Sequence, residues 1–219
     1  GKVGLEKAFD KYPDLIISDV MMPEMDGFVL CQKIKSNERI SHIPVILLTA
    51  KADLDSKIDG LEFGADDYVT KPFEARELQI RSKNLIEQRR KLREKFSQLN
   101  DLNPEDISVT SADEKLLQRL LEVFENHIEE ADFTTEVLAR EVGMSRMNLN
   151  RKLQALANQS TREFLRTMRL KRAAVLLKKY GGTVSEIAYK VGYNNISSFA
   201  KAFRKLYGMS QRSYIGKER

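Results

Sequence analysis

The stretch Leu138-Ala139-x-x-Val142-Gly143 occurs a second time as Ile187-Ala188-x-x-Val191-Gly192, 49 positions later. A second match follows each glycine at an offset of 50, where Arg151, Leu153 and Leu156 correspond to Lys201, Phe203 and Leu206. The extra residue therefore falls in the segment after the glycine. Each copy predicts an apolar helix, a glycine turn and a second helix with a basic outer face, which is the pattern of a helix-turn-helix. Two copies indicate two units that read double-stranded DNA.

In the first unit we expect Thr135 to cap a helix that ends near Val142, and Ser145 to cap the helix that begins at Arg146. Helical periodicity predicts that the leucines of the second helix are buried: Leu149, Leu153 and Leu156. The opposite face carries side chains that can contact bases: Arg146, Met147, Asn150, Arg151 and Gln154. Arginine suits guanine, asparagine suits adenine, and methionine can contact a thymine methyl group.

In the second unit the sequence predicts a helix from Val184 to Val191 and another from about Ile196. The inward positions of the latter are Phe199, Phe203 and Leu206. The predicted DNA-facing residues are Asn195, Ile196, Ser197, Ala200, Lys201 and Arg204. This set has fewer base-reading groups than the first, so we expect it to contribute mostly phosphate contacts. A helix over 162–179 joins the units, and its ~27 Å length is compatible with heads in successive major grooves ~34 Å apart.

Charge is divided unevenly along the 219 residues. Residues 134–219 contain 18 Lys and Arg against 5 Asp and Glu, whereas residues 1–133 contain 19 against 27. This asymmetry predicts one half that meets nucleic-acid phosphates and one that does not. The single cysteine, Cys31, excludes an internal disulfide and fits a reducing compartment. No apolar run reaches the ~18 residues of a membrane span, so we expect a cytoplasmic protein without membrane contact.

The acidic half alternates short apolar strands with helical patterns. The strands are expected at 15–19, 45–49 and 67–70, and the helices at 28–36, 54–63 and from Glu74 onward. This order predicts a parallel sheet covered on both faces, followed by an all-helical second half. The predicted division is a first domain over 1–88, a helical or coiled linker over 89–114 and a DNA-binding domain over 115–219.

Three chemically useful side chains follow the predicted strands: Asp19, Thr49 and Lys71. The carboxyl ends of parallel strands meet at one edge of a sheet, where ligands gather. A carboxylate can accept a phosphoryl group, and a hydroxyl and an ammonium can bind its oxygens. An aspartyl phosphohydrolase is disfavoured, because it needs a second carboxylate two residues on and position 21 is methionine.

Residues 19–27 (DVMMPEMDG), 47–50 (LLTA) and 68–73 (YVTKPF) closely resemble the receiver domain of bacterial response regulators, which has a flavodoxin-like fold. The resemblance implies that a histidine kinase or phosphotransfer domain phosphorylates Asp19. It also implies that Thr49 and Tyr68 move as a switch, that Lys71 pairs with the phosphoaspartate, and that the Lys71–Pro72 bond is cis. No other enzymatic activity is expected of this chain.

The receiver pattern is incomplete, because the family's first strand, first helix and second strand have no counterpart before Gly1. The family's acidic pair, which helps to hold Mg²⁺, is therefore missing, and only the Asp19 side chain and the Met21 carbonyl remain as ligands. Since Mg²⁺ needs several oxygen ligands, we expect it in an intact receiver and not in this fragment. We also expect an open edge on the strand that ends at Asp19 and excision from a longer protein.

Residues 115–214 resemble the AraC family of transcription factors. The resemblance is carried by three stretches, with x for any residue: RLxxAxxLL over 169–177, IAxxVGY over 187–193 and FxxxFRKxYGMS over 199–210. Gln211 stands where the family usually has proline. The resemblance implies a transcription factor whose two heads enter adjacent major grooves.

Leucines recur every seven residues in the connecting helix: Leu78, Leu85, Leu92 and Leu99. Such a stripe favours a dimeric coiled coil. The second apolar position of each heptad is poor, with Ser82, Arg89 and Phe96, so packing of the helix on its own sheet remains an alternative.

The sequence thus predicts a phosphorylation-controlled DNA-binding regulator that forms a homodimer when active. We expect it to be the output portion of a hybrid histidine kinase, whose kinase would lie outside this chain, at the cytoplasmic end of a membrane-spanning protein. The alternatives are a stand-alone response regulator and a pseudo-receiver that only pairs two DNA-binding proteins.

Overall fold

The computed structural model describes residues 1–50, 64–98, 110–179 and 182–216. Backbone contacts divide the chain into two compact units, the first built around a sheet and the second containing most of the helices after residue 117. The predicted helix over 54–63 lies outside the described residues, as does the fourth leucine of the heptad stripe, Leu99.

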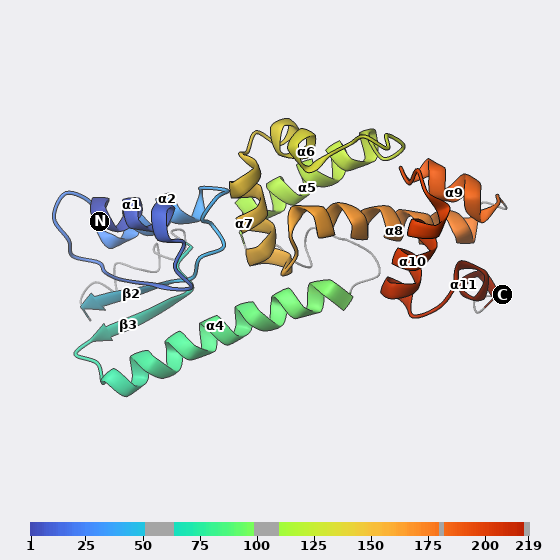
Figure 1. Ribbon diagram of the computed structural model, residues 1–219. Coiled ribbons are helices and arrows are strands. Elements are labelled where there is room, and N and C mark those ends of the chain that lie inside the picture. Colours follow the sequence, from blue (N-terminus) through green and yellow to red (C-terminus); the bar gives the residue numbers. More distant parts are fainter. Residues whose placement is uncertain (51–63, 99–109, 180–181, 217–219) are drawn as a thin grey trace. The chain divides into compact units, whose positions relative to one another are not determined.

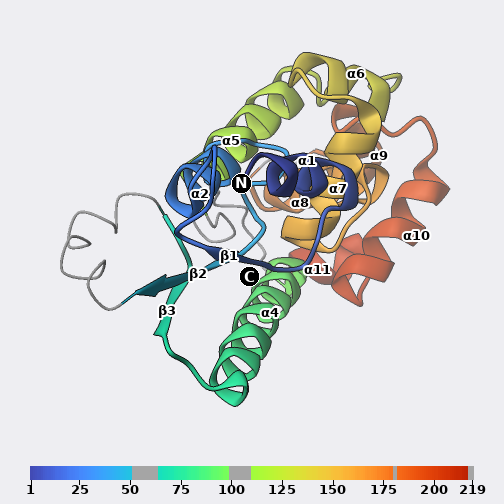
Figure 2. The same ribbon diagram turned by 90° about the vertical axis from the view of Figure 1, so that its left-hand side faces the viewer.

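The sheet of the first unit has three parallel strands, β1 (Ile16–Asp19), β2 (Val45–Ala50) and β3 (Asp67–Lys71), in the order β1-β2-β3. Figure 1 labels β2 and β3, and Figure 2 labels all three strands. Each lies within a residue or two of its predicted position. The parallel α/β class is therefore confirmed. Parallel strands run the same way, so their carboxyl ends meet at one edge of the sheet.

Helices cover both faces of this sheet. Figures 1 and 2 show α1 (Lys2–Lys11) and α2 (Gly27–Lys35) on one side of the strands and α4 (Ala75–Gln98) on the other. Val45 and Leu47 of β2 belong to the core on the α1–α2 side, whereas Ile46 between them is equally buried but points to the other face. Cys31 is fully buried in this core, and burial raises the pKa of its thiol to about 11.

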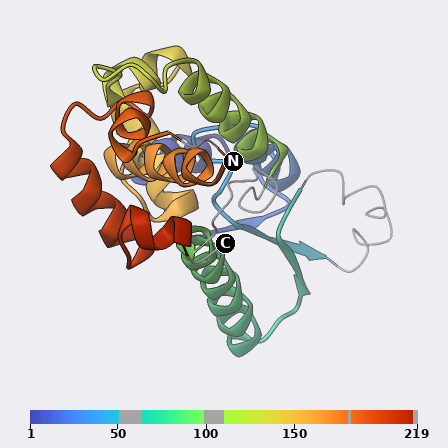
Figure 3. The same ribbon diagram turned by 90° about the vertical axis from the view of Figure 1, so that its right-hand side faces the viewer.

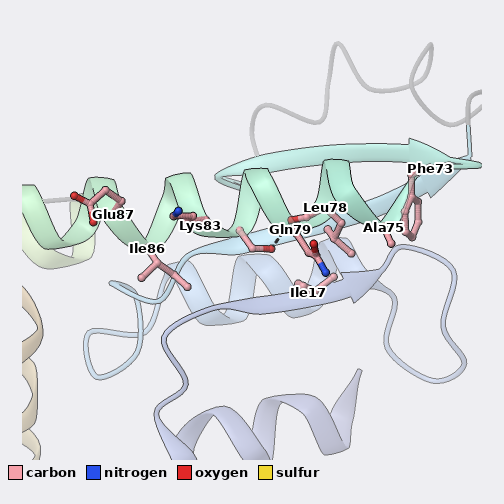
Figure 4. A pocket seen from close by; sticks show the side chains of 9 residues that line it. Ile17, Phe73, Ala75, Leu78, Gln79, Lys83, Ile86 and Glu87 are labelled. Atoms are coloured by element: carbon pink, nitrogen blue, oxygen red, sulfur yellow. Dashed lines mark hydrogen bonds between the residues drawn. The ribbon is translucent and has the colours of Figure 1, made fainter.

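The outer edge of β1 has no strand beside it within the described residues, as expected from the incomplete pattern. Ile17, which faces away from the α1–α2 core, is 44% exposed. Together with Phe73, Leu78 and Ile86 it lines an apolar groove of about 590 Å³ between β1 and α4, and Figure 4 shows these side chains converging on it.

Hydrogen bonds among three charged side chains, Lys35, Asp66 and Arg89, connect α4 to the rest of the first unit. Asp66, just before β3, accepts hydrogen bonds from Lys35 Nζ at 2.5 Å, from the Val45 backbone N–H at 2.7 Å and from Arg89 Nη2 at 2.5 Å. The Lys35, Asp66 and Arg89 side chains are only 9%, 14% and 15% exposed. Burial lowers the pKa of Lys35, while Asp66 opposes that shift. Arg89, which occupies a heptad position that suits an apolar residue, thus pairs with Asp66 next to the sheet. This contact supports the alternative that α4 packs on the sheet of its own chain rather than in a dimeric coiled coil.

The second unit is entirely helical in its described part, as predicted. Its elements are α5 (Ser111–Asn126), which begins before the unit does, α6 (Thr135–Glu141), α7 (Arg146–Ala157), α8 (Thr161–Lys179), α9 (Val184–Lys190), α10 (Ile196–Tyr207) and α11 (Gln211–Gly216). Figure 3 views the molecule from the side of the last three helices. Residues of α8, α9 and α10 share one buried core that includes Leu170, Ile187 and Phe199.

The predicted inward positions are mostly confirmed. Leu149, Leu153, Leu156, Phe199 and Phe203 are no more than 2% exposed, but Leu206 is 37% exposed and the prediction for it was wrong. The inward side of the last turn of α10 is filled instead by Tyr207, which packs on Phe203 with ring centroids 4.5 Å apart. The cap of α6 is Thr134, one residue earlier than predicted, because its hydroxyl accepts from the Val137 N–H.

We predict that Arg89→Ala destabilises the first unit by about 1–3 kcal/mol, because Asp66 would stay buried with one of its two cations gone. The measurement is hydrogen exchange of the β3 amides, which should lose protection. Arg90→Ala is the matched control. The Arg90 side chain is 59% exposed and its pairs with Glu87 and Glu94 lie at the surface, so little change is expected. Equal loss of protection in the two variants would contradict the assignment.

Candidate functional site

Strand register brings the predicted phosphoacceptor residues to one edge of the sheet. Asp19 ends β1 opposite Leu48, and Lys71 ends β3 opposite Ala50. Thr49 lies between them near the end of β2, and Tyr68 lies farther back on β3. Although up to 52 positions apart in sequence, Asp19, Thr49 and Lys71 therefore lie on neighbouring strand ends.

The Asp19 carboxylate already accepts hydrogen bonds from groups around it. Lys71 Nζ forms an ion pair with its Oδ2, and the Met21 N–H donates to its Oδ1 at 3.1 Å. The hydrogen bond from Lys71 is the main cause of a lowered Asp19 pKa. The carboxylate is 35% exposed, so it is ionised and reachable from solvent, as a nucleophile for phosphorus must be.

The two residues that the receiver resemblance implies as a switch differ in burial. Thr49 is 1% exposed, and its hydroxyl donates to the Ala50 carbonyl at 3.2 Å. Tyr68 is half-buried against the α1–α2 core, and burial raises the pKa of its hydroxyl. The Lys71–Pro72 peptide bond is cis, as the receiver resemblance implied.

The loop after Asp19 depends on Asp26 and Gly27, whose roles the sequence reasoning did not assign. The Asp26 carboxylate accepts from the Val29 N–H at 2.8 Å and caps α2. A Cβ on Gly27 would lie 2.3 Å from the Asp19 carbonyl oxygen, so only glycine fits there. The feature of the sequence that could have indicated these roles is the Asp-Gly pair at the start of a helical pattern. The pair keeps the loop folded over the end of β1.

The residues present do not fit a Mg²⁺ site. Among the residues that the structure describes, no three Asp, Glu, His or Cys side chains lie close enough together to hold a metal ion. Asp19 offers one carboxylate, which is engaged by Lys71, and Mg²⁺ requires more oxygens than this. The expectation that this fragment binds Mg²⁺ poorly stays a prediction.

The two helix-turn-helix turns have the same backbone construction. Gly143 and Gly192 have φ of +73° and +75°, a left-handed conformation that favours glycine. The N–H after each glycine bonds back to the first helix, Met144 to the Ala139 carbonyl and Tyr193 to the Ala188 carbonyl. The sequence repeat is therefore also a structural repeat.

The caps of the second helices account for the change of offset. Ser145 Oγ accepts from the Asn148 N–H at 3.2 Å, and Asn195 Oδ1 accepts from the Ser198 N–H at 2.8 Å. The caps are 50 positions apart, whereas the glycines are 49 apart, so the extra residue lies between glycine and cap as predicted.

Several predicted DNA-facing residues of α7 are exposed, and Arg146 and Asn150 form hydrogen bonds within the protein. Met147 is 60% exposed, and Arg151 and Gln154 are also exposed. Arg146 Nη1 binds Glu136 Oε1 at 2.5 Å and lowers the pKa of that carboxyl to about 2. Asn150 is half-buried, and its Oδ1 accepts from the Thr161 N–H at 3.0 Å, so it caps the start of α8.

The predicted face of α10 is more uniform. Ile196, Ser197, Lys201 and Arg204 are exposed, and Ala200 is half-buried. Asn195 is exposed as well, but its side-chain oxygen is used in the cap. The two faces thus differ in chemistry as expected, and their individual DNA contacts remain predictions.

Arg169 of α8 has a role that the sequence reasoning did not assign. Its guanidinium donates to the carbonyls of Gly192 at 3.0 Å and Glu130 at 2.9 Å, which belong to the second turn and to the segment before α6. A Cβ on Gly192 would lie 3.0 Å from this guanidinium and 2.8 Å from the Ile128 carbonyl, so the close approach again requires glycine. The feature of the sequence that could have indicated this role is the position of Arg169 within the apolar face of the helix. Arg169 therefore joins the two helix-turn-helix units.

Comparison with protein-family models agrees with this division. Residues 1–83 match the response regulator receiver domain, and residues 138–216 match a helix-turn-helix domain. The chain combines a response regulator receiver domain with an AraC-type helix-turn-helix domain. This combination fits a DNA-binding response regulator of a two-component system.

Individual relatives match one or both domains. Histidine kinase P4 of Formosa agariphila is 41% identical over 214 residues, which cover 98% of this chain and 16% of the kinase. The DNA-binding dual master transcriptional regulator RpaA of Synechocystis is 44% identical over 86 residues, 39% of this chain and 36% of that protein. The structure of a DNA-binding transcriptional dual regulator from Escherichia coli K-12 is 29% identical, covers 48% of this chain and 94% of that one, and gives a TM-score of 0.43. The chain thus spans 16% and 36% of the lengths of these two curated relatives.

Both domains lack a membrane-crossing element in their described parts, where no helix is both long and apolar enough to span a bilayer. The domain limits at residues 88 and 115 remain predictions. The receiver's last helix, α4, continues past residue 88 as a single element.

We predict that Lys71→Met raises the pKa of the receiver's Asp19, because its main stabilising donor is lost. The measurement is an NMR titration of the ¹³C-labelled Asp19 carboxyl. Since the folded pKa of Asp19 is lowered, this pair stabilises the receiver above the ordinary aspartate pKa and ceases to do so as pH falls through the lowered value. Lys33→Met, a change at an exposed lysine of α2, is the control and should leave the titration unchanged. An unchanged Asp19 titration in Lys71→Met would refute the pairing.

Proposed function

We propose that this chain is the output portion of a hybrid histidine kinase and that phosphorylation of Asp19 controls its binding to specific DNA sites. The observation that carries the proposal is the matched pair of glycine turns, each followed by a capped helix with exposed polar or basic residues. Two such helices on one polypeptide suit two successive major grooves of one duplex. The similarity to Histidine kinase P4, of which the chain spans 16%, supports a place within a longer kinase. Binding to DNA would place this part of the protein in the cytoplasm.

The two heads have different proposed tasks. On α7, Met147, Arg151 and Gln154 are exposed and able to meet base edges, so the first head would read sequence. On α10, Lys201 and Arg204 would bind phosphates and hold the second head in register, with Ser197 and Ile196 at the groove. Arg146 and Asn150 would contact bases only with atoms that their protein partners leave available, such as the Asn150 amide N–H groups.

The proposed switch begins with phosphoryl transfer from a histidine of a kinase or phosphotransfer partner to an Asp19 carboxylate oxygen. Lys71 is already beside that carboxylate and would pair with the phosphoryl oxygens. Thr49 would turn its buried hydroxyl from the Ala50 carbonyl toward the phosphoryl group, and Tyr68 would follow inward. The outcome would be pairing of two receivers and a closer spacing of their DNA-binding domains.

A pseudo-receiver is the second candidate. In this candidate the ion pair between Lys71 and Asp19 would hold the end of β3 to the end of β1 permanently, and the receivers would pair without being phosphorylated. This candidate keeps the DNA-binding function and removes the control at Asp19.

We predict that Arg151→Ala costs roughly 1–3 kcal/mol in binding to the preferred duplex and relaxes base preference, because a base contact is lost. Arg204→Ala should instead weaken binding to all duplexes alike. Fluorescence anisotropy with a selected and an unrelated duplex measures both effects. Equal, sequence-independent losses from the two variants would contradict the assigned faces, and affinity insensitive to salt would contradict DNA as the ligand.

We predict that beryllofluoride, which mimics a phosphoryl group, strengthens both self-association and DNA binding of the full-length protein that contains this chain. Light scattering and anisotropy before and after treatment measure the two responses. Asp19→Asn should abolish both responses while leaving basal DNA binding in place. No response of the unmodified protein would favour the pseudo-receiver.

A further inference from the structure

A cleft in the second unit lies between its two helix-turn-helix units. Its volume is about 850 Å³, and it is bordered by the start of α6, the first half of α8 and the turn before α10. The residues used below are Glu136, Ser160, Arg162, Glu163, Arg166 and Tyr193. None of them was among the predicted DNA contacts.

The charge that the cleft offers to a ligand is positive. Arg162 and Arg166 are exposed, and their spacing of four residues places them on one face of α8. Arg166 is near enough to the Glu163 carboxylate to contribute to the lowered pKa of that group, but the hydrogen bonds from Ser160 are the larger cause. The two acidic groups already have partners: Glu136 binds Arg146, and Glu163 accepts from Ser160 N at 2.9 Å and Ser160 Oγ at 2.7 Å. The available groups are thus two guanidinium ions, which suit phosphate oxygens.

The position of the cleft relates it to both DNA-reading helices. At one end Glu136 holds Arg146, the first residue of α7. At the other end Tyr193 precedes by two residues Asn195, which caps α10. Both ends of the cleft therefore lie beside the starts of α7 and α10. In helix-turn-helix domains these N-terminal parts of the recognition helices are the parts that contact base edges.

The DNA between two successive major grooves on one face exposes the minor groove and its two bordering sugar–phosphate strands. The 19 residues of α8 span ~28 Å, close to the ~34 Å that separates the grooves. A cationic cleft between the heads would therefore lie over these phosphates.

We propose that Arg162 and Arg166 bind phosphates of the DNA backbone between the two major grooves, an inference that rests on the proposed DNA-binding function. The contact fixes the duplex against the centre of the AraC-type domain and is independent of sequence. It gives the domain a third contact region, beside the faces of α7 and α10.

The test compares Arg162→Ala/Arg166→Ala with Arg172→Ala/Lys179→Ala, which removes the same charge from exposed positions of the same helix. Affinity for a selected and an unrelated duplex is measured by anisotropy over a range of salt concentrations. The first variant should lower the slope of log affinity against log salt by about 2, reduce affinity for both duplexes to a similar extent, and keep their ratio. Arg162→Lys/Arg166→Lys should retain most of the slope. Circular dichroism confirms that each variant is folded.

A second measurement locates the contact. Methylphosphonates, which are uncharged, replace single phosphates between the two grooves of the selected duplex. Wild-type protein should bind these duplexes less tightly, and the Arg162→Ala/Arg166→Ala protein should be insensitive to them.

The inference is overturned if the two double alanine variants lose the same slope, or if the substituted phosphates have no effect on the wild type. Tight binding of inorganic pyrophosphate that depends on Arg162 and Arg166, with an unchanged DNA slope, would overturn it in favour of a small-anion site. A wild-type protein that binds no duplex would instead refute the proposed function itself, so the two failures are distinguishable.

Discussion

The AraC-type domain depends on the hydrogen bonds of one guanidinium. Arg169 donates to carbonyls that precede the first helix-turn-helix and that form the turn of the second. Backbone carbonyls at such turns have no helical partner, so losing a half-buried donor that satisfies them is costly. Because arginine presents several donors in a rigid plane, one side chain can fix two loops at a set separation. The orientation of α9 and α10 toward α6 therefore depends on this contact, and so does the spacing of the proposed reading heads.

A comparable constraint operates in the receiver domain, where charged groups connect elements that local sequence does not relate. Asp66 joins α2, β2 and α4 through Lys35, the Val45 N–H and Arg89. Lys71 joins the end of β3 to the end of β1 through Asp19. The two networks differ in exposure. The first is largely buried and therefore structural, whereas the Asp19 carboxylate is 35% exposed and reachable from solvent.

Much of the fold was predictable because the spacing of apolar residues indicates which faces of helices and strands are buried. The alternation of apolar strands with helices placed Asp19, Thr49 and Lys71 at one sheet edge, and the repeat placed Leu149 and Phe199 in helix cores. Other positions were not predictable from pattern. Leu206 follows the helical period but is exposed, because the aromatic ring of Tyr207 fills the space beside Phe203. Asn150 was predicted to lie on the outer face of α7, yet its side-chain oxygen accepts a hydrogen bond from the Thr161 N–H at the start of α8. This contact depends on where the start of α8 packs against α7.

The sequence by itself determined the two domain classes, the repeated turn with its extra residue, and the position of Asp19 at the end of a strand. Each of these follows from residue type at fixed local spacing, which sets backbone conformation and helix or strand faces. Only the tertiary structure decided how individual polar side chains are used: Arg169 between two turns, Arg89 on Asp66, and Arg146 on Glu136. A hydrogen bond between residues distant in sequence depends on how elements pack and on which partners are already engaged, and neither is encoded in a local pattern.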